Sequence, residues 1–277
     1  MAERLVLQKL LAAPISHAIV ESGLDQVGGY VTEASAVDSL RTPADLLAAY
    51  GVDAAPDFAD VVRFEQPRLA TFTKPSDAER PWVDFPLGFL HGESLAPVWR
   101  MSRTRFSYGA EYWRIRSDGE QKRLSRYEGA ARGWVGAKRW RPPSPMVGTL
   151  ARWKGHEFFA DVIAESVLLT AITDGSPARF AQVRPGVWSA TVPLSECEVF
   201  ERIFTAQVDD VPARVLRSGG GTAEVLLLTD DPSDAGRVGA GRVEAGVFEA
   251  VVDNSRLTNV QGVESEWVPS AGSAGTE

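Results

Sequence analysis

VRPGVWSATV at residues 183–192 and VEAGVFEAVV at residues 243–252 are the two stretches that decide the predicted fold, because the second repeats the first. Five of the ten aligned positions are identical, and the aromatic residue is kept as Trp188 and Phe248. After the glycine, side chains alternate in character, which is typical of a β-strand entered from a tight turn. We expect Trp188 and Phe248 to anchor the cores of two related units.

The match continues upstream in the same order. VLLT at residues 167–170 matches VLLLT at residues 225–229 with a small insertion. Before it, residues 152–162 and 206–216 both have the pattern strand, polar turn, strand, and the turns are Lys154-Gly155 and Asp209-Asp210. This ordered correspondence predicts a duplication.

The predicted units are residues 146–200 and 201–268. Each has the density of short strands that is typical of a small SH3-like or split β-barrel. A unit of this size buries too little surface to be robust alone, so the two copies are expected to pack together. Residues 269–277 are small and polar and are predicted to be a disordered tail.

The N-terminal residues 1–55 are predicted to be helical. Leu5, Val6, Leu10 and Leu11 can share one face of a short helix that stops at Pro14. A second helix is predicted from Thr42-Pro43-Ala44-Asp45, in which Thr42 caps, Pro43 takes the first position and Asp45 complements the positive end. Gly51 is expected to close that helix.

Residues 56–145 are predicted to form a Trp/Arg-rich α+β or β domain. Residues 61–64 are expected to form a strand, and residues 111–117 and 121–127 a hairpin around Asp118-Gly119. Residues 74–80 are predicted to be a loop, and the apolar residues between 82 and 90 to pack on the following sheet. Pro142-Pro143-Ser144-Pro145 cannot extend a sheet and marks the expected boundary. The fold class is therefore α+β and mainly β.

The most unusual composition lies between Arg100 and Arg141, where twelve Lys/Arg face four Asp/Glu in a chain whose net charge is −8. Three interpretations of these bases are possible. The preferred one is that they pair with acidic residues of the same chain; the others are that they bind an acidic surface of another protein or single-stranded nucleic acid. The net charge disfavours nucleic acid as a partner. The candidate binding residues of this segment are Tyr112, Arg114, Arg116, Lys122, Arg126 and Trp134.

Motifs for chemistry are weak. Cys197 is the single cysteine, and His17, His91 and His156 lack metal-ligand spacing, so neither a metal nor a cofactor is predicted. His91-Gly92-Glu93 is expected to be a turn. The stretch Ser218-Gly219-Gly220-Gly221 precedes a predicted strand, whereas a phosphate-binding loop precedes a helix. An enzyme of ADP-ribosyl-transfer type, with Arg114, Ser125 and Glu128 contributing, is a weaker alternative.

Location and function follow from these observations as expectations. Acidic Glu3 and the interrupted apolar run at the N-terminus argue against a signal peptide, no stretch reaches the ~18 apolar residues of a membrane span, and the cytoplasm of a bacterium is expected. The predicted function is a non-enzymatic protein-binding or adaptor role of immunity or secretion-accessory type. The alternatives are an enzyme with a site between the basic sheet and the repeats, and a single-stranded nucleic-acid binder.

Overall fold

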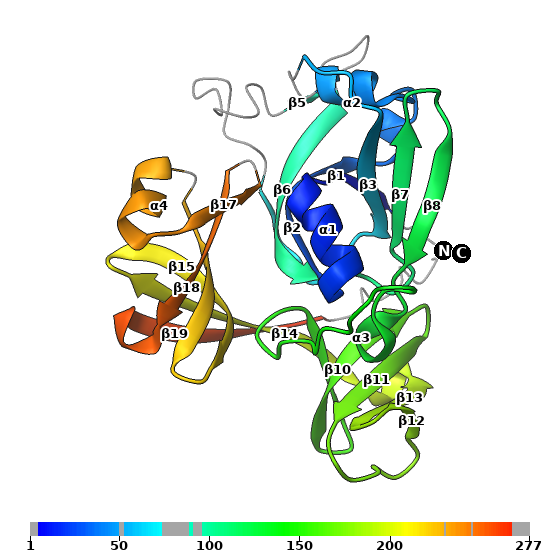
Figure 1. The fold of residues 1–277 in the computed structure, drawn as a ribbon. Helices are drawn as coiled ribbons and strands as arrows, with labels where there is room; N and C mark the ends of the chain where they lie inside the picture. The colour runs from blue at the N-terminus through cyan, green and yellow to red at the C-terminus, as the bar shows by residue number, and fades with distance from the viewer. Residues whose placement is uncertain are drawn as a thin grey trace, which may run out of the picture.

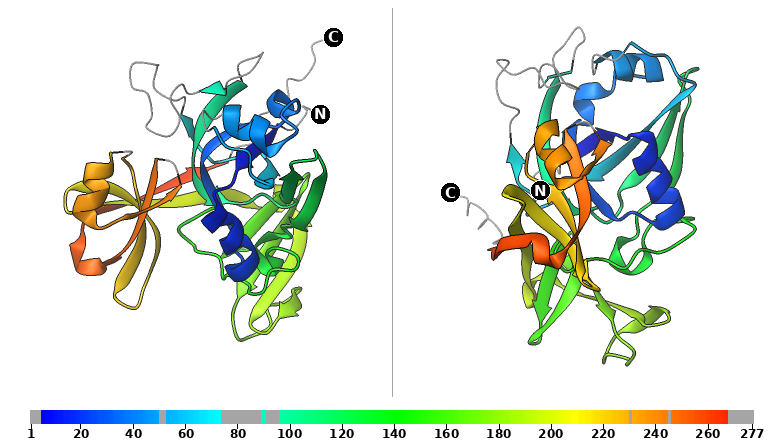
Figure 2. Two further views of the ribbon diagram at one scale, coloured as in Figure 1. Left: turned by 45° about the horizontal axis from the view of Figure 1, so that its top comes forward. Right: turned by 60° about the vertical axis from the view of Figure 1, so that its left-hand side comes forward.

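The computed structural model describes residues 5–49, 53–73, 89–90, 96–229, 231–244 and 246–267. It is mainly β and consists of two antiparallel sheets, neither of which closes into a barrel within these residues (Figure 1). Figure 2 shows three lobes: the first sheet with its helices, the β9–β13 lobe, and a lobe of β15–β18 with α4.

The first sheet has the strand order β4-β6-β2-β1-β3-β7-β8, with β5 paired to β6. Its elements, in chain order, are β1 (Val6–Leu10), α1 (Ala13–Ser22), β2 (Gln26–Glu33), η1 (Ser35–Val37), α2 (Pro43–Ala49), β3 (Phe58–Glu65), β4 (Phe72–Thr73), β5 (Phe89–Leu90), β6 (Ala96–Arg105), β7 (Glu111–Arg116), β8 (Gln121–Arg126) and α3 (Gly129–Arg132).

The predicted first helix is wrong. Residues 6–10 form β1, which lies between β2 and β3, so that Gln8 and Lys9 are buried together with Leu7. Pairing on both edges satisfies the backbone of this short segment, which a single amphipathic helical turn could not do. A helix begins where one was expected to stop, because α1 accepts Pro14 in its first turn, where the missing N–H costs nothing.

The second helix is confirmed as α2. The Thr42 hydroxyl accepts a hydrogen bond from the Asp45 amide at 3.2 Å, and the Asp45 carboxylate accepts one from the Thr42 amide at 3.0 Å. This reciprocal pair is a capping box. Gly51, the loop at residues 74–80, most of the apolar stretch before residue 89, His91 and Glu93, and the tail at residues 269–277 lie outside the described residues.

The central hairpin is confirmed as β7 and β8, with Gly119 at a φ of +83° in the turn. The strand predicted at residues 61–64 is part of β3, which pairs with β7. Residues 133–136 do not form a full strand, and Trp134 contributes only an isolated bridge to Tyr127. Residues 141–148, which contain the proline-rich segment, connect the first sheet to the second without a strand.

The second sheet has the order β12-β13-β11-β10-β9-β14-β15-β16-β18-β17, and β19 pairs with the other edge of β14. Its elements are β9 (Thr149–Trp153), β10 (His156–Ile163), β11 (Ser166–Ile172), β12 (Ala181–Arg184), β13 (Val187–Pro193), η2 (Leu194–Glu196), β14 (Glu198–Val208), β15 (Val211–Gly219), β16 (Thr222–Leu227), α4 (Pro232–Val238), β17 (Gly241–Glu244), β18 (Val247–Asp253), η3 (Asn254–Arg256) and β19 (Leu257–Glu266).

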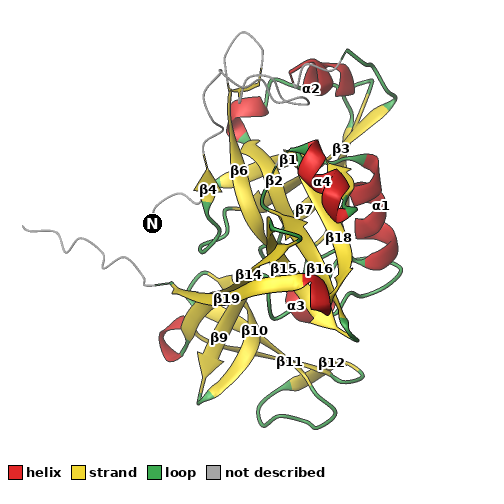
Figure 3. Cartoon of the chain, turned by 90° about the vertical axis from the view of Figure 1, so that its left-hand side faces the viewer, coloured by secondary structure: helices red, strands yellow, loops and turns green. Residues whose placement is uncertain are grey.

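Strand β14 belongs to both halves of this sheet (Figure 3). Its first residues pair with β9, and its last residues pair with β15. Each half has its own buried cluster, one containing Trp153 and Leu169 and the other Val225 and Phe248. Because one strand serves two cores, the halves cannot separate without breaking β14.

Buried charges join the lobes. Arg214 of β15 pairs with Glu201 of β14 at 3.0 Å and donates to the backbone carbonyl of Arg103 in the first sheet. Lys9 of β1 pairs with Glu244 of β17 at 2.5 Å. These contacts fix the first sheet against the second half of the second sheet. Removing one member of such a buried pair is destabilising, because it leaves the other charge buried without compensation.

Candidate functional site

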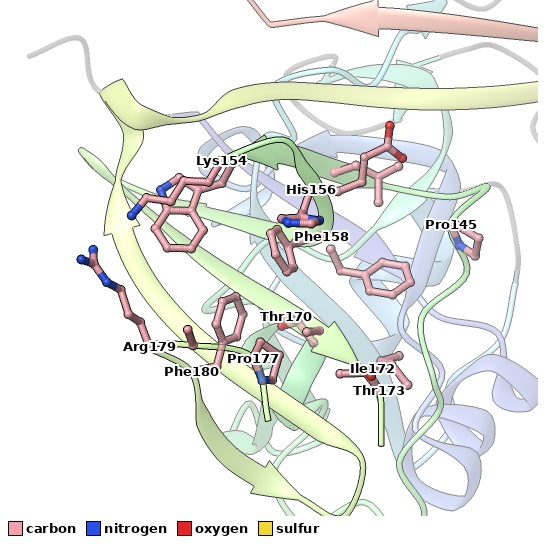
Figure 4. Close-up of a pocket in the computed structure, with 16 residues that line it drawn as sticks. Pro145, Lys154, His156, Phe158, Thr170, Ile172, Thr173, Pro177, Arg179 and Phe180 are labelled. Carbon is pink, nitrogen blue, oxygen red and sulfur yellow. The ribbon is translucent and has the colours of Figure 1, made fainter. Parts of the chain in front are cut away.

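A cavity of about 760 Å³ lies in the β9–β13 lobe, at the end of the β9–β10 hairpin (Figure 4). We call it the aromatic groove. The side chains that line it are Pro145, Leu150, Trp153, Lys154, His156, Glu157, Phe158, Phe159, Thr170, Ala171, Ile172, Thr173, Pro177, Ala178, Arg179 and Phe180.

A tight turn positions one wall of the groove. Lys154 and Gly155 have φ values of +52° and +78°, the left-handed pair that two-residue hairpins favour. The turn places Trp153 directly opposite His156, and Phe158 follows on the same side of β10 because side chains alternate along a strand. The other wall comes from the loop after β11.

Aromatic rings form the groove's apolar surface. The centroids of Phe158 and Phe180 are 5.1 Å apart, and that of Trp153 lies 6.4 Å from Phe158 and 6.3 Å from Phe180. The Trp153 indole N–H donates to the Glu196 carboxylate at 3.0 Å, which fixes the ring. A preformed aromatic surface of this kind binds an apolar side chain without first having to order its own residues.

Two cations stand on the groove's rim. Lys154 and Arg179 are exposed and lie on the same side of the groove in Figure 4. The Lys154 ammonium is 4.5 Å from the centroid of the Trp153 ring, and neither cation has a carboxylate partner among the described residues. Arg179 is held at a φ of +72°, an uncommon conformation for a residue with a side chain.

The groove's carboxylate is already engaged. Glu157 pairs with Arg202 at 2.9 Å and with Arg152 at 3.2 Å. Hydrogen bonding from Arg202 lowers the pKa of Glu157, so this group stays ionised and paired at neutral pH. One buried polar atom, the hydroxyl oxygen of Thr170, lines the groove without a hydrogen-bond partner.

The predicted binding residues do not share one surface. Tyr112 and Arg114 do come together, because both bind Asp60: the Tyr112 hydroxyl donates at 2.7 Å and the Arg114 guanidinium at 2.8 and 2.9 Å. Burial, with Asp60 beside it, raises the pKa of Tyr112 to about 12. They line a second cavity of about 540 Å³, which α1, Lys9 and Glu244 also line.

The remaining candidates lie apart from this cavity. Arg116 is exposed and 3.9 Å from Glu120, and Lys122 and Arg126 are exposed on the edge strand β8. Trp134 is buried in the core of the first sheet, and its indole N–H donates to the Leu24 carbonyl at 2.8 Å.

Several arginines of the basic segment pair within the chain. Arg141 pairs with Glu224 at 2.9 Å, Arg123 with Glu111, and Arg103 with Glu249. The protein itself therefore neutralises part of their positive charge. The exposed basic residues of the segment are spread over β7, β8, α3 and the loop after α3.

The two proposed anchors differ. Phe248 is buried in its cluster, whereas Trp188 is half-buried and lies outside the cluster of its own lobe, with its indole N–H donating to the Thr173 carbonyl at 3.0 Å. Trp153, which the sequence did not single out, fills that core instead. Cys197 is partly buried, and burial raises the pKa of its thiol, which makes it a poor nucleophile.

Comparison with protein-family models, with curated proteins and with solved structures gave no match. Within the described part of the chain, no helix has both the length and the apolar character needed to cross a membrane. The groove residues were missed by the sequence analysis. One signal was available: aromatic Trp153 and Phe158 flank the Lys154-Gly155 turn, whereas small aliphatic Val208 and Ala213 hold the matching positions around Asp209-Asp210.

Proposed function

We propose that the chain is a non-enzymatic protein-binding or adaptor protein of the bacterial cytosol, and that a segment of its partner binds in the aromatic groove. The proposal includes tandem duplication: residues 146–200 and 201–268 are two copies of one SH3-like module. The immunity or secretion-accessory setting remains the biological context that we propose.

The pairing scheme supports the duplication. In the first copy, β9, β10, β11 and β13 are successive neighbours, β12 pairs with β13, and η2 leads into β14, which returns to β9. In the second copy, β14, β15, β16 and β18 follow the same order, β17 pairs with β18, and η3 leads into β19, which returns to β14.

Local details also correspond. The backbone N–H of Leu194, which opens η2, donates to the Glu165 carbonyl, and that of Asn254, which opens η3, donates to the Gly221 carbonyl, both at 2.9 Å. The register shifts at Gln182/Arg184 in the first copy and at Arg242/Glu244 in the second. Corresponding irregularities of this kind support common ancestry more strongly than strand order alone.

The register corrects the upstream sequence match. Leu169 pairs with Ala190, and Val225 pairs with Ala250, so Leu169 corresponds to Val225. By strand register, Val167 therefore corresponds to Ala223 and not to Val225, so the sequence match is shifted by two residues. With this correspondence, Thr173 and Thr229 become equivalent, and no insertion lies within the strand.

The insertion falls in the following loop instead. Seven residues (174–180) separate Thr173 from β12 in the first copy, and eleven (230–240) separate Thr229 from β17 in the second. The longer loop contains α4, whose Ala235 and Val238 are buried in the cluster of the second copy.

That cluster also contains Val208, Val211 and Ala213, which correspond by register to Trp153, His156 and Phe158 of the groove. Helix α4 therefore covers in the second copy the region that is open in the first. This observation carries the proposal. The second copy buries this region under its own helix, whereas the first copy leaves an aromatic surface open, and an open apolar surface of this kind favours binding of another molecule.

The groove suits a protein segment better than the alternatives. Its lining is mainly apolar. Glu157 is the one carboxylate among its described lining residues, and it is already paired with Arg202. In the second cavity, Tyr112 and Arg114 both donate hydrogen bonds to Asp60, so catalysis there would first require breaking these bonds. Nucleic acid would need a continuous basic track, whereas the groove's rim has two cations.

The test is selection of binders from a library of random peptides on the immobilised full chain. We expect peptides with about micromolar Kd values that lose at least tenfold in affinity for Ala178→Trp, because Ala178 is exposed and lines the groove, so that tryptophan fills it without disturbing the core. Val263→Trp, on exposed β19, is the matched control and should bind like wild type. Failure to select any peptide, or equal binding by Ala178→Trp, would remove the groove from the proposed function.

A further inference from the structure

We infer that the occupant of the aromatic groove is a short acidic helix of another protein, with two small aliphatic side chains three residues apart and carboxylates at its C-terminal end. This inference rests on the proposed function and deepens it. It identifies the partner by its chemistry, from the way in which the second copy is closed.

Charge gives the first argument. The turn that holds Lys154-Gly155 in the first copy holds Asp209-Asp210 in the second, and Asp209 is paired with Arg256 of η3. In the first copy, the residue at the position of Arg256 is Glu196, which accepts from Trp153 instead of pairing with Lys154. Asp209 is therefore neutralised by Arg256 in the second copy, whereas Lys154 at the corresponding position of the first copy lacks a carboxylate partner among the described residues.

Shape gives the second argument. Helix α4 buries Ala235 and Val238, which are three residues apart and so share one face of the helix. The first copy has larger rings at the corresponding positions and a cavity of about 760 Å³, so the aliphatic side chains of a short helix can pack on the surface that Trp153, Phe158 and Phe180 form.

The C-terminal end of α4 lies next to the charged turn of the second copy. Arg256 donates to the Val238 carbonyl at 3.1 Å as well as to Asp209, so the C-terminal end of α4 lies beside the turn. A helix bound in the same way in the first copy would bring its C-terminal end to Lys154. A cation there complements the negative end of the helix dipole, and carboxylates on the last turn would pair with Lys154 and Arg179.

The experiment uses three synthetic peptides with amidated C-termini, measured by fluorescence anisotropy with the full chain. The first is an alanine-rich helical peptide with an Ala-x-x-Val pair and two glutamates in its last turn. The second has two lysines in place of the glutamates, and the third is an extended proline-rich peptide that keeps the glutamates. At ~0.15 M salt, where only close charges interact, we expect the first to bind about tenfold more tightly than either of the others.

The matched variant is Lys154→Asp with Arg179→Asp. Aspartate suits the turn, since Asp209 adopts the same left-handed conformation in the second copy. This variant should reverse the preference between the acidic and the lysine-bearing helices, whereas Lys154→Arg with Arg179→Lys should retain it. Lys122→Glu, on exposed β8, controls for overall charge and should change nothing.

The outcomes separate this inference from the proposed function. Tighter binding of the lysine-bearing or proline-rich peptide, or an acidic preference that survives in the Asp variant, would overturn the inference. If Ala178→Trp still abolishes binding in those cases, the groove remains the binding site. If Ala178→Trp binds every peptide as wild type does, the proposed function fails as well.

Discussion

Glu201→Gln is expected to lower the free energy of unfolding by about 3–5 kcal/mol. Glu201 is 1% exposed and pairs with Arg214, which is buried as well, at 3.0 Å. It also accepts a hydrogen bond from the Gly148 amide at 3.1 Å. Glutamine keeps the shape of the side chain and can still accept a hydrogen bond, but it lacks the negative charge that compensates the buried guanidinium of Arg214.

The loss should be large because this pair lies where the lobes meet. Arg214 also donates to the Arg103 carbonyl of the first sheet, and burial lowers the pKa of Arg214 while Glu201 raises it. Leaving a cation in this position without its partner costs more than the pair itself contributes.

Urea denaturation measures the change. Glu198→Gln is the matched control, since Glu198 lies on the same strand but forms an exposed pair with Arg152 at 2.6 Å. It should cost no more than about 1 kcal/mol. A Glu201→Gln protein within about 1 kcal/mol of wild type would show that Arg214 is solvated or is compensated by another group.

Trp153→Ala is expected to cost about 3–5 kcal/mol and Trp188→Ala clearly less, although the repeat motif contains Trp188. Trp153 is 6% exposed, belongs to the buried cluster of its lobe and contacts two other rings. Trp188 lies outside that cluster, so its truncation removes less buried area and one hydrogen bond to the Thr173 carbonyl.

Thermal unfolding of both variants distinguishes the two roles. Trp153→Phe serves as the control that keeps an aromatic ring while losing the donor to Glu196. An equal or greater loss for Trp188→Ala would mean that the repeat's aromatic position anchors both copies, as the sequence suggested.

Elements with their own local chemistry were predictable from the sequence. The Asp118-Gly119 turn specifies the hairpin, because glycine adopts the left-handed conformation observed at residue 119. The α2 start was predictable for the same reason, since Thr42 and Asp45 satisfy each other within one turn. Neither prediction required knowledge of tertiary contacts.

Elements that depend on distant partners were not predictable. Strand β1 contains Gln8 and Lys9, and the partners of the buried Lys9 ammonium are the carboxylate of Glu244 and the carbonyl of Tyr30, both distant in the sequence. The groove likewise depends on a register that differs by two residues from the apparent sequence match, and on a loop that is four residues shorter than its counterpart. Local patterns contain no information about what covers a surface.

The central claim is that an acidic helix from a partner covers the aromatic groove as α4 covers the second copy. The most direct measurement is titration of the ¹⁵N-labelled chain with the glutamate-bearing helical peptide, following the tryptophan indole resonances, with Trp153→Phe to assign Trp153. We predict that the Trp153 resonance shifts in proportion to binding, because its ring lines the groove, and that buried Trp134 of the first sheet does not shift. Saturable binding that leaves the Trp153 resonance in place would contradict the account.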